Sequence, residues 1–193
     1  PAYIPRGKPR GPTLQTVERF NCSIMSEVLA NVTEHGVPSK NAGWFVLAQC
    51  HKKSGIISIC IGDNGIGIRH SLLTGGQRKE ILARFSEHER ASDSEMILKS
   101  LSEYISGAID AEPPKETLLG GHKLSPGSHR GRGLKRIVST CKLIGAEFTL
   151  LSQRGCVSLK KDGTYKISTD TKERCFAGTL YHFILPAKHV KAI

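Results

Sequence analysis

The sequence Ile61-Gly62-Asp63-Asn64-Gly65-Ile66-Gly67-Ile68 follows a β-branched apolar run that begins at Gly55. The run predicts a strand, and the acid, the amide and the two spaced glycines after it predict a sharp turn of the backbone. An aspartate at the end of a strand can accept a hydrogen bond from the amino group of a ligand, and such charge-assisted bonds are strong in a dry site. An ordinary hairpin uses the same Asp-Asn-Gly turn, so this stretch alone leaves both interpretations open.

Length and composition predict one domain with an anionic ligand or partner. The chain has 193 residues, which suits a single core, and its formal net charge is +11. That charge favours a polyanion, a class that includes nucleic acid, an anionic membrane surface and a phosphorylated small ligand. The six cysteines form no Cys-x-x-Cys pair and lie mostly in apolar runs, which favours reduced core thiols and a cytoplasmic location over disulfides or zinc ligands. No apolar run approaches the ~20 residues of a membrane span.

The first part of the chain predicts a basic arm followed by a helix. Residues 1–13 are rich in proline, glycine and basic side chains and are expected to form an arm or linker, with a single domain over 14–193. Apolar side chains recur every four residues over 14–35, which predicts a helix that stops at Gly36. Glu27 and Asn31 lie one turn apart in this helix and therefore on one side of it. Taken alone, such a pair is usually only solvated.

A hairpin and a long insertion come next. Residues 44–51 and 55–62 flank a short polar turn and predict two antiparallel strands. The insertion at about 69–130 contains helical patterns over 78–89 and 94–109, and Asp93 or Ser94 is expected to cap the second. A polar loop over 110–130 completes the insertion, and loops of that length often act as lids over a site.

The last third of the chain predicts one helix and a group of strands. The helix opens with Gly131-Arg132-Gly133-Leu134 and ends near Gly145. Its glycine-rich start presents free backbone amides that favour a bound phosphate, although these glycines would equally serve to end the loop. Strands are expected over 147–152, 155–160, 164–168 and 174–185, and the last has two apolar faces, which predicts a central position in the sheet.

Four features thus occur in a fixed order: a helix with Glu27 and Asn31, a strand ending in Asp63-Asn64-Gly65-Ile66-Gly67-Ile68, a loop running into Gly131-Arg132-Gly133-Leu134, and a late strand with Gly178-Thr179. This combination resembles the ATP-binding domain shared by DNA gyrase, the large ATP-dependent heat-shock chaperones, sensor histidine kinases and MutL, called the GHKL superfamily or Bergerat fold. The resemblance covers the chain from about Cys22 to Pro186. It implies an α+β fold, a two-layer α/β sandwich whose mixed, mostly antiparallel sheet carries helices on one face.

The resemblance implies that the chain binds ATP together with Mg²⁺. Asn31 matches the asparagine whose side-chain oxygen binds Mg²⁺, and Glu27 matches the acid that activates the attacking water in the hydrolysing members. Asp63 matches the residue that recognises the adenine amino group. The other implied contacts involve Gly65 and Gly67 (backbone closing over the base), Ile68 (an apolar wall), Gly131, Arg132, Gly133 and Leu134 (phosphates), Arg130 or Arg132 (a phosphate-binding cation) and Thr179 (hydrogen bonding beneath the adenine).

Two hypotheses for the use of ATP follow. The sequence from Asn31 to Gly36 resembles the Asn-x-x-x-His-Gly pattern of anti-sigma serine kinases and related stand-alone domains, although the insertion at 69–130 is longer than compact anti-sigma factors carry. The first hypothesis is an ATP-dependent enzyme, a protein kinase or a slow ATPase. The alternative is a non-catalytic module in which ATP orders the loop at 110–130 and so regulates a protein partner. Nucleic-acid binding through the arm that contains Arg6, Lys8 and Arg10 is less favoured than a solvated linker.

Overall fold

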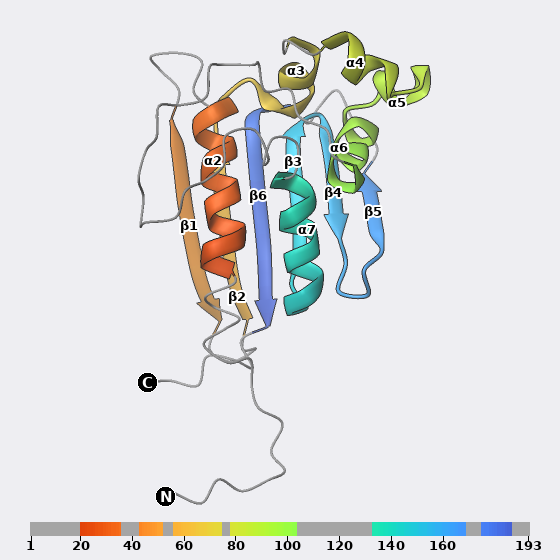
Figure 1. The fold of residues 1–193 in the computed structure, drawn as a ribbon. Helices are drawn as coiled ribbons and strands as arrows, with labels where there is room; N and C mark the ends of the chain where they lie inside the picture. The colour runs from red at the N-terminus through yellow and green to blue at the C-terminus, as the bar shows by residue number, and fades with distance from the viewer. Residues whose placement is uncertain are drawn as a thin grey trace, which may run out of the picture.

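Six strands form one open sheet in the order β1-β2-β6-β3-β4-β5 (Figure 1). The computed structural model describes residues 20–35, 43–51, 56–74, 78–103, 133–168 and 175–186. The strands are β1 (Trp44–His51), β2 (Ile56–Asp63), β3 (Glu147–Gln153), β4 (Gly155–Leu159), β5 (Tyr165–Ser168) and β6 (Phe176–Pro186). The predicted hairpin and the strands of the last third are therefore confirmed, with bounds that differ by one to two residues.

All five strand pairings between these segments are antiparallel, so the expectation of a mixed sheet is wrong. The reason is the position of β6, which lies between β2 and β3 and runs antiparallel to both. β2 and β3 thus run in the same direction without being neighbours. The predicted central position of β6 is confirmed, because it hydrogen-bonds to a strand on each side.

Helices cover one face of the sheet, as the sequence predicted. A π-helical segment (Phe20–Met25) leads into α2 (Ser26–His35), and α7 (Gly133–Ile144) lies beside α2 over the sheet (Figure 1). α6 (Asp93–Ser102) packs on β4, and the short helices α3 (Gly67–Thr74), α4 (Arg78–Ala83) and α5 (Glu87–Ala91) lie near one end of the sheet. The result is an α+β arrangement compatible with a two-layer sandwich.

The region of the insertion differs from its prediction in four respects. The pattern at 78–89 forms two helices because Ser86 begins α5 with a capping box: its hydroxyl accepts from the Glu89 amide, and the Glu89 carboxylate accepts from the Ser86 amide at 2.7 Å. This backbone bond, followed by the Lys99 amine, lowers the pKa of Glu89 to about 2. The cap of α6 is Ser92 rather than Asp93 or Ser94, and α6 ends at Ser102. Helix α3 was not predicted.

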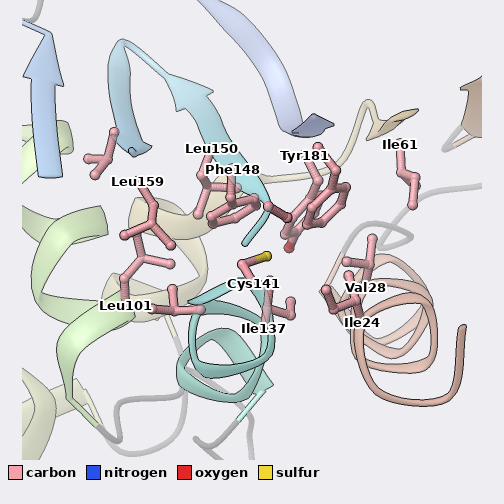
Figure 2. Packing of buried hydrophobic residues seen from close by; sticks show 14 of the residues in the cluster. Ile24, Val28, Ile61, Leu101, Ile137, Cys141, Phe148, Leu150, Leu159 and Tyr181 are labelled. Carbon is pink, nitrogen blue, oxygen red and sulfur yellow. The ribbon is translucent and has the colours of Figure 1, made fainter. Parts of the chain in front are cut away.

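The core lies between the sheet and α2, α6 and α7. Ile24 of the π-helical segment, Val28 of α2 and Ile137 of α7 point toward the buried side chains of β3, β4 and β6 (Figure 2). Phe148 and Phe183 stack at 5.1 Å between ring centroids, which orders this layer. Since the apolar sides of three helices and a sheet meet here, their packing fixes how the strand ends are placed.

The six cysteines are free, but the expectation that they are mostly core thiols is wrong. Cys141 alone is fully buried, and its burial raises its pKa to about 12. The exposed thiols are Cys22, Cys50 and Cys175.

The predicted arm at 1–13 and loop at 110–130 lie outside the described residues. Among the helices that the structure does describe, none is long and apolar enough to cross a membrane.

Candidate functional site

Three buried polar side chains lie in one row across the ends of three neighbouring strands. Asp63 of β2 pairs in register with Thr179 of β6, which in turn pairs with Ser152 of β3. Their residues are 4%, 5% and 1% exposed, respectively. Buried polar groups are rarely tolerated without partners, so this row is a built arrangement at the end of an otherwise apolar sheet face.

Asp63 is held by the turn that follows it. Its Oδ1 atom accepts a hydrogen bond of 2.8 Å from the Gly65 amide, which confirms the predicted turn after the strand. Gly178, just before Thr179, has a φ of +92°, and a Cβ atom there would overlap the backbone oxygen of Asp63. Glycine is therefore needed at 178 for both conformation and space, because it lets β6 approach the carboxylate closely.

Glycine is also needed at position 67, for both conformation and space. Its φ is +74°, and a Cβ atom would stand 2.9 Å from the Ser152 Oγ and 3.0 Å from a carbon of Gln153. Ile68, expected to give the base an apolar wall, packs its side chain between the main core and a smaller cluster around Leu72. Gly67 and Ile68 begin α3, and the first turn of this helix lies against the end of β3.

Ser152 of β3 joins the first turn of α3 to β6 through hydrogen bonds. The sequence did not predict this role. Its hydroxyl accepts from the Ile68 amide at 2.9 Å and donates to the Gly178 carbonyl at 2.9 Å, and it lies 3.4 Å from the Thr179 hydroxyl. The signal that points to it is the period of two along β3, where Phe148 and Leu150 face the core and a serine takes the next inward position.

A second group of predicted residues meets where α2 and α7 adjoin. A Cβ atom on Gly133 would lie 3.0 Å from the Glu27 Oε2 and 3.5 Å from the Asn31 Oδ1. The structure thus brings the first residue of α7 against the two side chains that the helix periodicity put on one side of α2. Leu134 packs against the core, whereas Arg130, Gly131 and Arg132 lie outside the described residues.

Arg136 adds a cation that the sequence analysis did not single out. Its guanidinium donates to the Glu27 Oε1 at 2.8 Å, across 109 positions of sequence. The Glu27 side chain is 19% exposed and that of Arg136 is 50% exposed, so the pair lies at the boundary between core and solvent. Nothing in the local sequence of either residue reveals this pairing, because it depends on how the two helices dock.

Tyr181 is a buried tyrosine of β6 close to the polar row. It follows Thr179 by two positions on β6, is 3% exposed, and has its ring stacked against Phe148 at 6.4 Å. Burial raises the pKa of its hydroxyl well above the ordinary value, the nearby Asp63 carboxylate raises it further, and a hydrogen bond with the Asn31 side chain acts in the opposite direction. Tyr181 therefore stays neutral beside the polar row at the strand ends.

Asn31 and Glu27 suit a metal ion that arrives with an anionic ligand. Within the described part of the chain, no three His, Cys, Asp or Glu side chains cluster in a way that would hold a metal ion. Mg²⁺ is commonly held by one or two protein oxygens, with phosphate oxygens and waters in the other positions. The buried Asn31 Nδ2 atom has no hydrogen-bond partner, and the absent side chain of Gly133 leaves space beside it. Both observations fit a site that a ligand completes.

Comparison with known proteins adds no assignment: no protein-family model and no curated protein was found to match this chain.

Proposed function

We propose that the chain is an Mg²⁺-dependent ATP-binding domain of the GHKL superfamily with the Bergerat fold. The observation that carries the proposal is that Gly133 lies close to Glu27 and Asn31. The resemblance predicts this closeness, because it implies that Gly133 contacts the phosphates and that Asn31 binds the Mg²⁺ ion held by them. A second observation supports it independently: Asp63 and Thr179, implied to contact the base, are register partners on neighbouring strands.

At the base end, the Asp63 carboxylate would accept a hydrogen bond from the adenine amino group. The Gly65 amide holds its Oδ1 atom, so the orientation of the carboxylate is set before the ligand binds. Thr179 and Ser152 supply hydroxyls beside it. A preorganised acceptor of this kind favours a flat ring with an exocyclic amine, because little ordering remains to be done on binding.

At the phosphate end, α7 would supply backbone amides and the positive end of its dipole. Its first turn contains no acidic side chain that would repel an anion, and Arg136 adds a positive charge nearby. Asn31 would give an oxygen to Mg²⁺ and Glu27 would act near the phosphates. The metal, when bound, neutralises phosphate charge and orients the terminal phosphoryl group.

The test of the proposal is isothermal calorimetry with ATP and Mg²⁺. Asp63→Asn should abolish measurable binding, because the amide presents a donor where an acceptor is needed. Asp162→Asn is the matched control: Asp162 is an exposed carboxylate that also accepts from the amide two residues later, at 2.9 Å, but lies in the turn between β4 and β5. Wild-type affinity in Asp63→Asn, or no ATP binding by the wild type, would reject the proposal.

The Glu27–Arg136 ion pair favours the second candidate, binding without turnover. Arg136 holds the Oε1 atom of Glu27 at 2.8 Å, so a general base at this position would have to use the Oε2 atom and work beside a fixed cation. A sensing module would bind ATP and release no appreciable phosphate. Phosphate release or transfer to a protein that disappears in Glu27→Gln would instead establish the enzyme, and Arg136→Ala should raise that activity if the ion pair restrains the base.

A further inference from the structure

The edge strand β1 exposes an apolar surface that the packing of the core does not use. Within the described residues, β1 pairs only with β2 and lies at the end of the strand order (Figure 1). Every residue of the strand is exposed. Four large apolar side chains follow one another along it: Trp44 (53% exposed), Phe45, Val46 and Leu47 (66% exposed). Apolar side chains that gather on a surface in this way mark a site of interaction.

The two edges of the sheet differ in how well they resist pairing with another chain. β5, at the far edge, has four residues and contains Lys166, and short or charged edge strands pair poorly with other chains. β1 has eight residues in continuous register with β2, and it contains no lysine, arginine, aspartate, glutamate or proline. β1 therefore has the length, the flatness and the composition of a strand-pairing edge.

Alternate residues of β1 direct their backbone groups away from β2. The Asn64 amide donates to the Gly43 carbonyl at 3.2 Å, one step before Trp44 pairs with Asp63 in the register. Residues of antiparallel strands alternate between bonding to the partner strand and pointing away from it, so Gly43 and the odd-numbered residues of β1 face β2. The even-numbered residues direct their N–H and C=O groups outward, where an added strand would bond. These residues are Trp44, Val46, Ala48 and Cys50.

The charge of the chain decides which kind of strand suits this edge. A second copy would carry the same formal charge of +11. Antiparallel pairing of two β1 strands would also bring the end that is followed by Lys52 and Lys53 in the sequence to the end that is preceded by Lys40. Like charges opposed in this way disfavour the pair. An acidic segment meets no such repulsion, and the net charge attracts it.

We infer that β1 is a docking edge for a protein partner, which adds an extended segment of β-branched residues with acidic flanks to the sheet. The backbone of that segment would bond to the outward groups of β1, and its side chains would cover the apolar side chains that β1 exposes. None of the residues of the proposed nucleotide site lies on β1, so the inference goes beyond ATP binding and does not depend on it.

The probe is a fluorescent peptide of alternating valines and threonines, eight residues long to match β1, with aspartates at both ends. Anisotropy at low salt should show binding, and lysines in place of the aspartates should weaken it by about tenfold or more. Ala48→Pro should raise the dissociation constant about tenfold, because proline removes an outward amide but no bond to β2. Ala48→Ser keeps the amide and is the control, expected within about twofold of wild type.

Two results with the peptide would overturn the inference. One is a wild-type protein that does not bind the acidic peptide or that binds the acidic and basic peptides equally. The other is equal affinity of folded Ala48→Pro and Ala48→Ser for the acidic peptide. Calorimetry with ATP on the same variants tests the proposed function separately, because β1 contributes no residue to that site.

Hydrogen exchange in the wild-type protein covers the case in which Ala48→Pro does not fold. The amides of Val46 and Ala48 should exchange quickly in the free protein and about tenfold more slowly, or slower still, with the peptide bound. Slow exchange without peptide would overturn the inference, because the edge would then already be covered. Sedimentation would show whether a second copy or the chain itself covers it.

Discussion

Replacing Ser152 with alanine should destabilise the protein by about 2–3 kcal/mol, far more than its small change in volume suggests. The hydroxyl joins α3 to β6 through two hydrogen bonds of 2.9 Å, from the Ile68 amide and to the Gly178 carbonyl. A net hydrogen bond contributes about 0.5–1.5 kcal/mol, and a buried group that loses its partner costs about 1–3 kcal/mol. Ser152 is 1% exposed, so water has poor access to the two backbone groups left behind.

The assay is equilibrium unfolding in urea, with the midpoint and slope fitted for each variant. The control is Ser158→Ala, which removes a strand serine whose hydroxyl, within the described residues, bonds only to the Thr149 hydroxyl, at 2.9 Å. That change should cost about 1 kcal/mol or less, because both groups are half-buried and water can replace the bond. Equal stability losses in the two variants would refute the view that Ser152 joins the strand ends.

Two further predictions concern the same region and the core. Gly178→Ala should destabilise more than Ser152→Ala and remove nucleotide binding, because alanine disfavours a φ of +92° and its methyl group would overlap the backbone of Asp63; wild-type unfolding and binding would contradict this. Cys141 should resist a thiol reagent at pH 8 in the folded protein, since its pKa of about 12 keeps it protonated and burial excludes the reagent. Mass spectrometry should find modification first at the exposed thiols Cys22, Cys50 and Cys175.

Elements with a strong local pattern were predictable from the sequence. The alternation in the late strand gave β6 its two apolar faces, and its position between β2 and β3 follows from burial on both sides. The helix of Glu27 and Asn31 was visible as a four-residue repeat. In each case, the information that decides the structure lies within a few neighbouring residues, and tertiary packing agrees with it.

Features that depend on contacts between distant residues were not predictable. Ser152 looks like any serine in a strand, and only the register of β3 with β6 reveals that it lies beside Thr179. The Glu27–Arg136 pair spans 109 positions and depends on how α2 docks against α7. The break at Ser86 was visible in principle, because Ser86 and Glu89 have the spacing of a capping box, but the apolar pattern on both sides suggested one helix.

The register of β6 decides the chemistry of the proposed site as well as the packing of the core. Thr179 faces Asp63, and Tyr181 and Phe183 follow on the same side at a period of two. A slip of one residue would place Leu180 beside the carboxylate and turn the Tyr181 hydroxyl to the other face of the sheet. The apolar inward side chains oppose that slip, so the packing that stabilises the fold also holds the polar row in place. Substitutions at Phe183 should therefore affect binding only through stability, unlike those at Asp63 or Thr179.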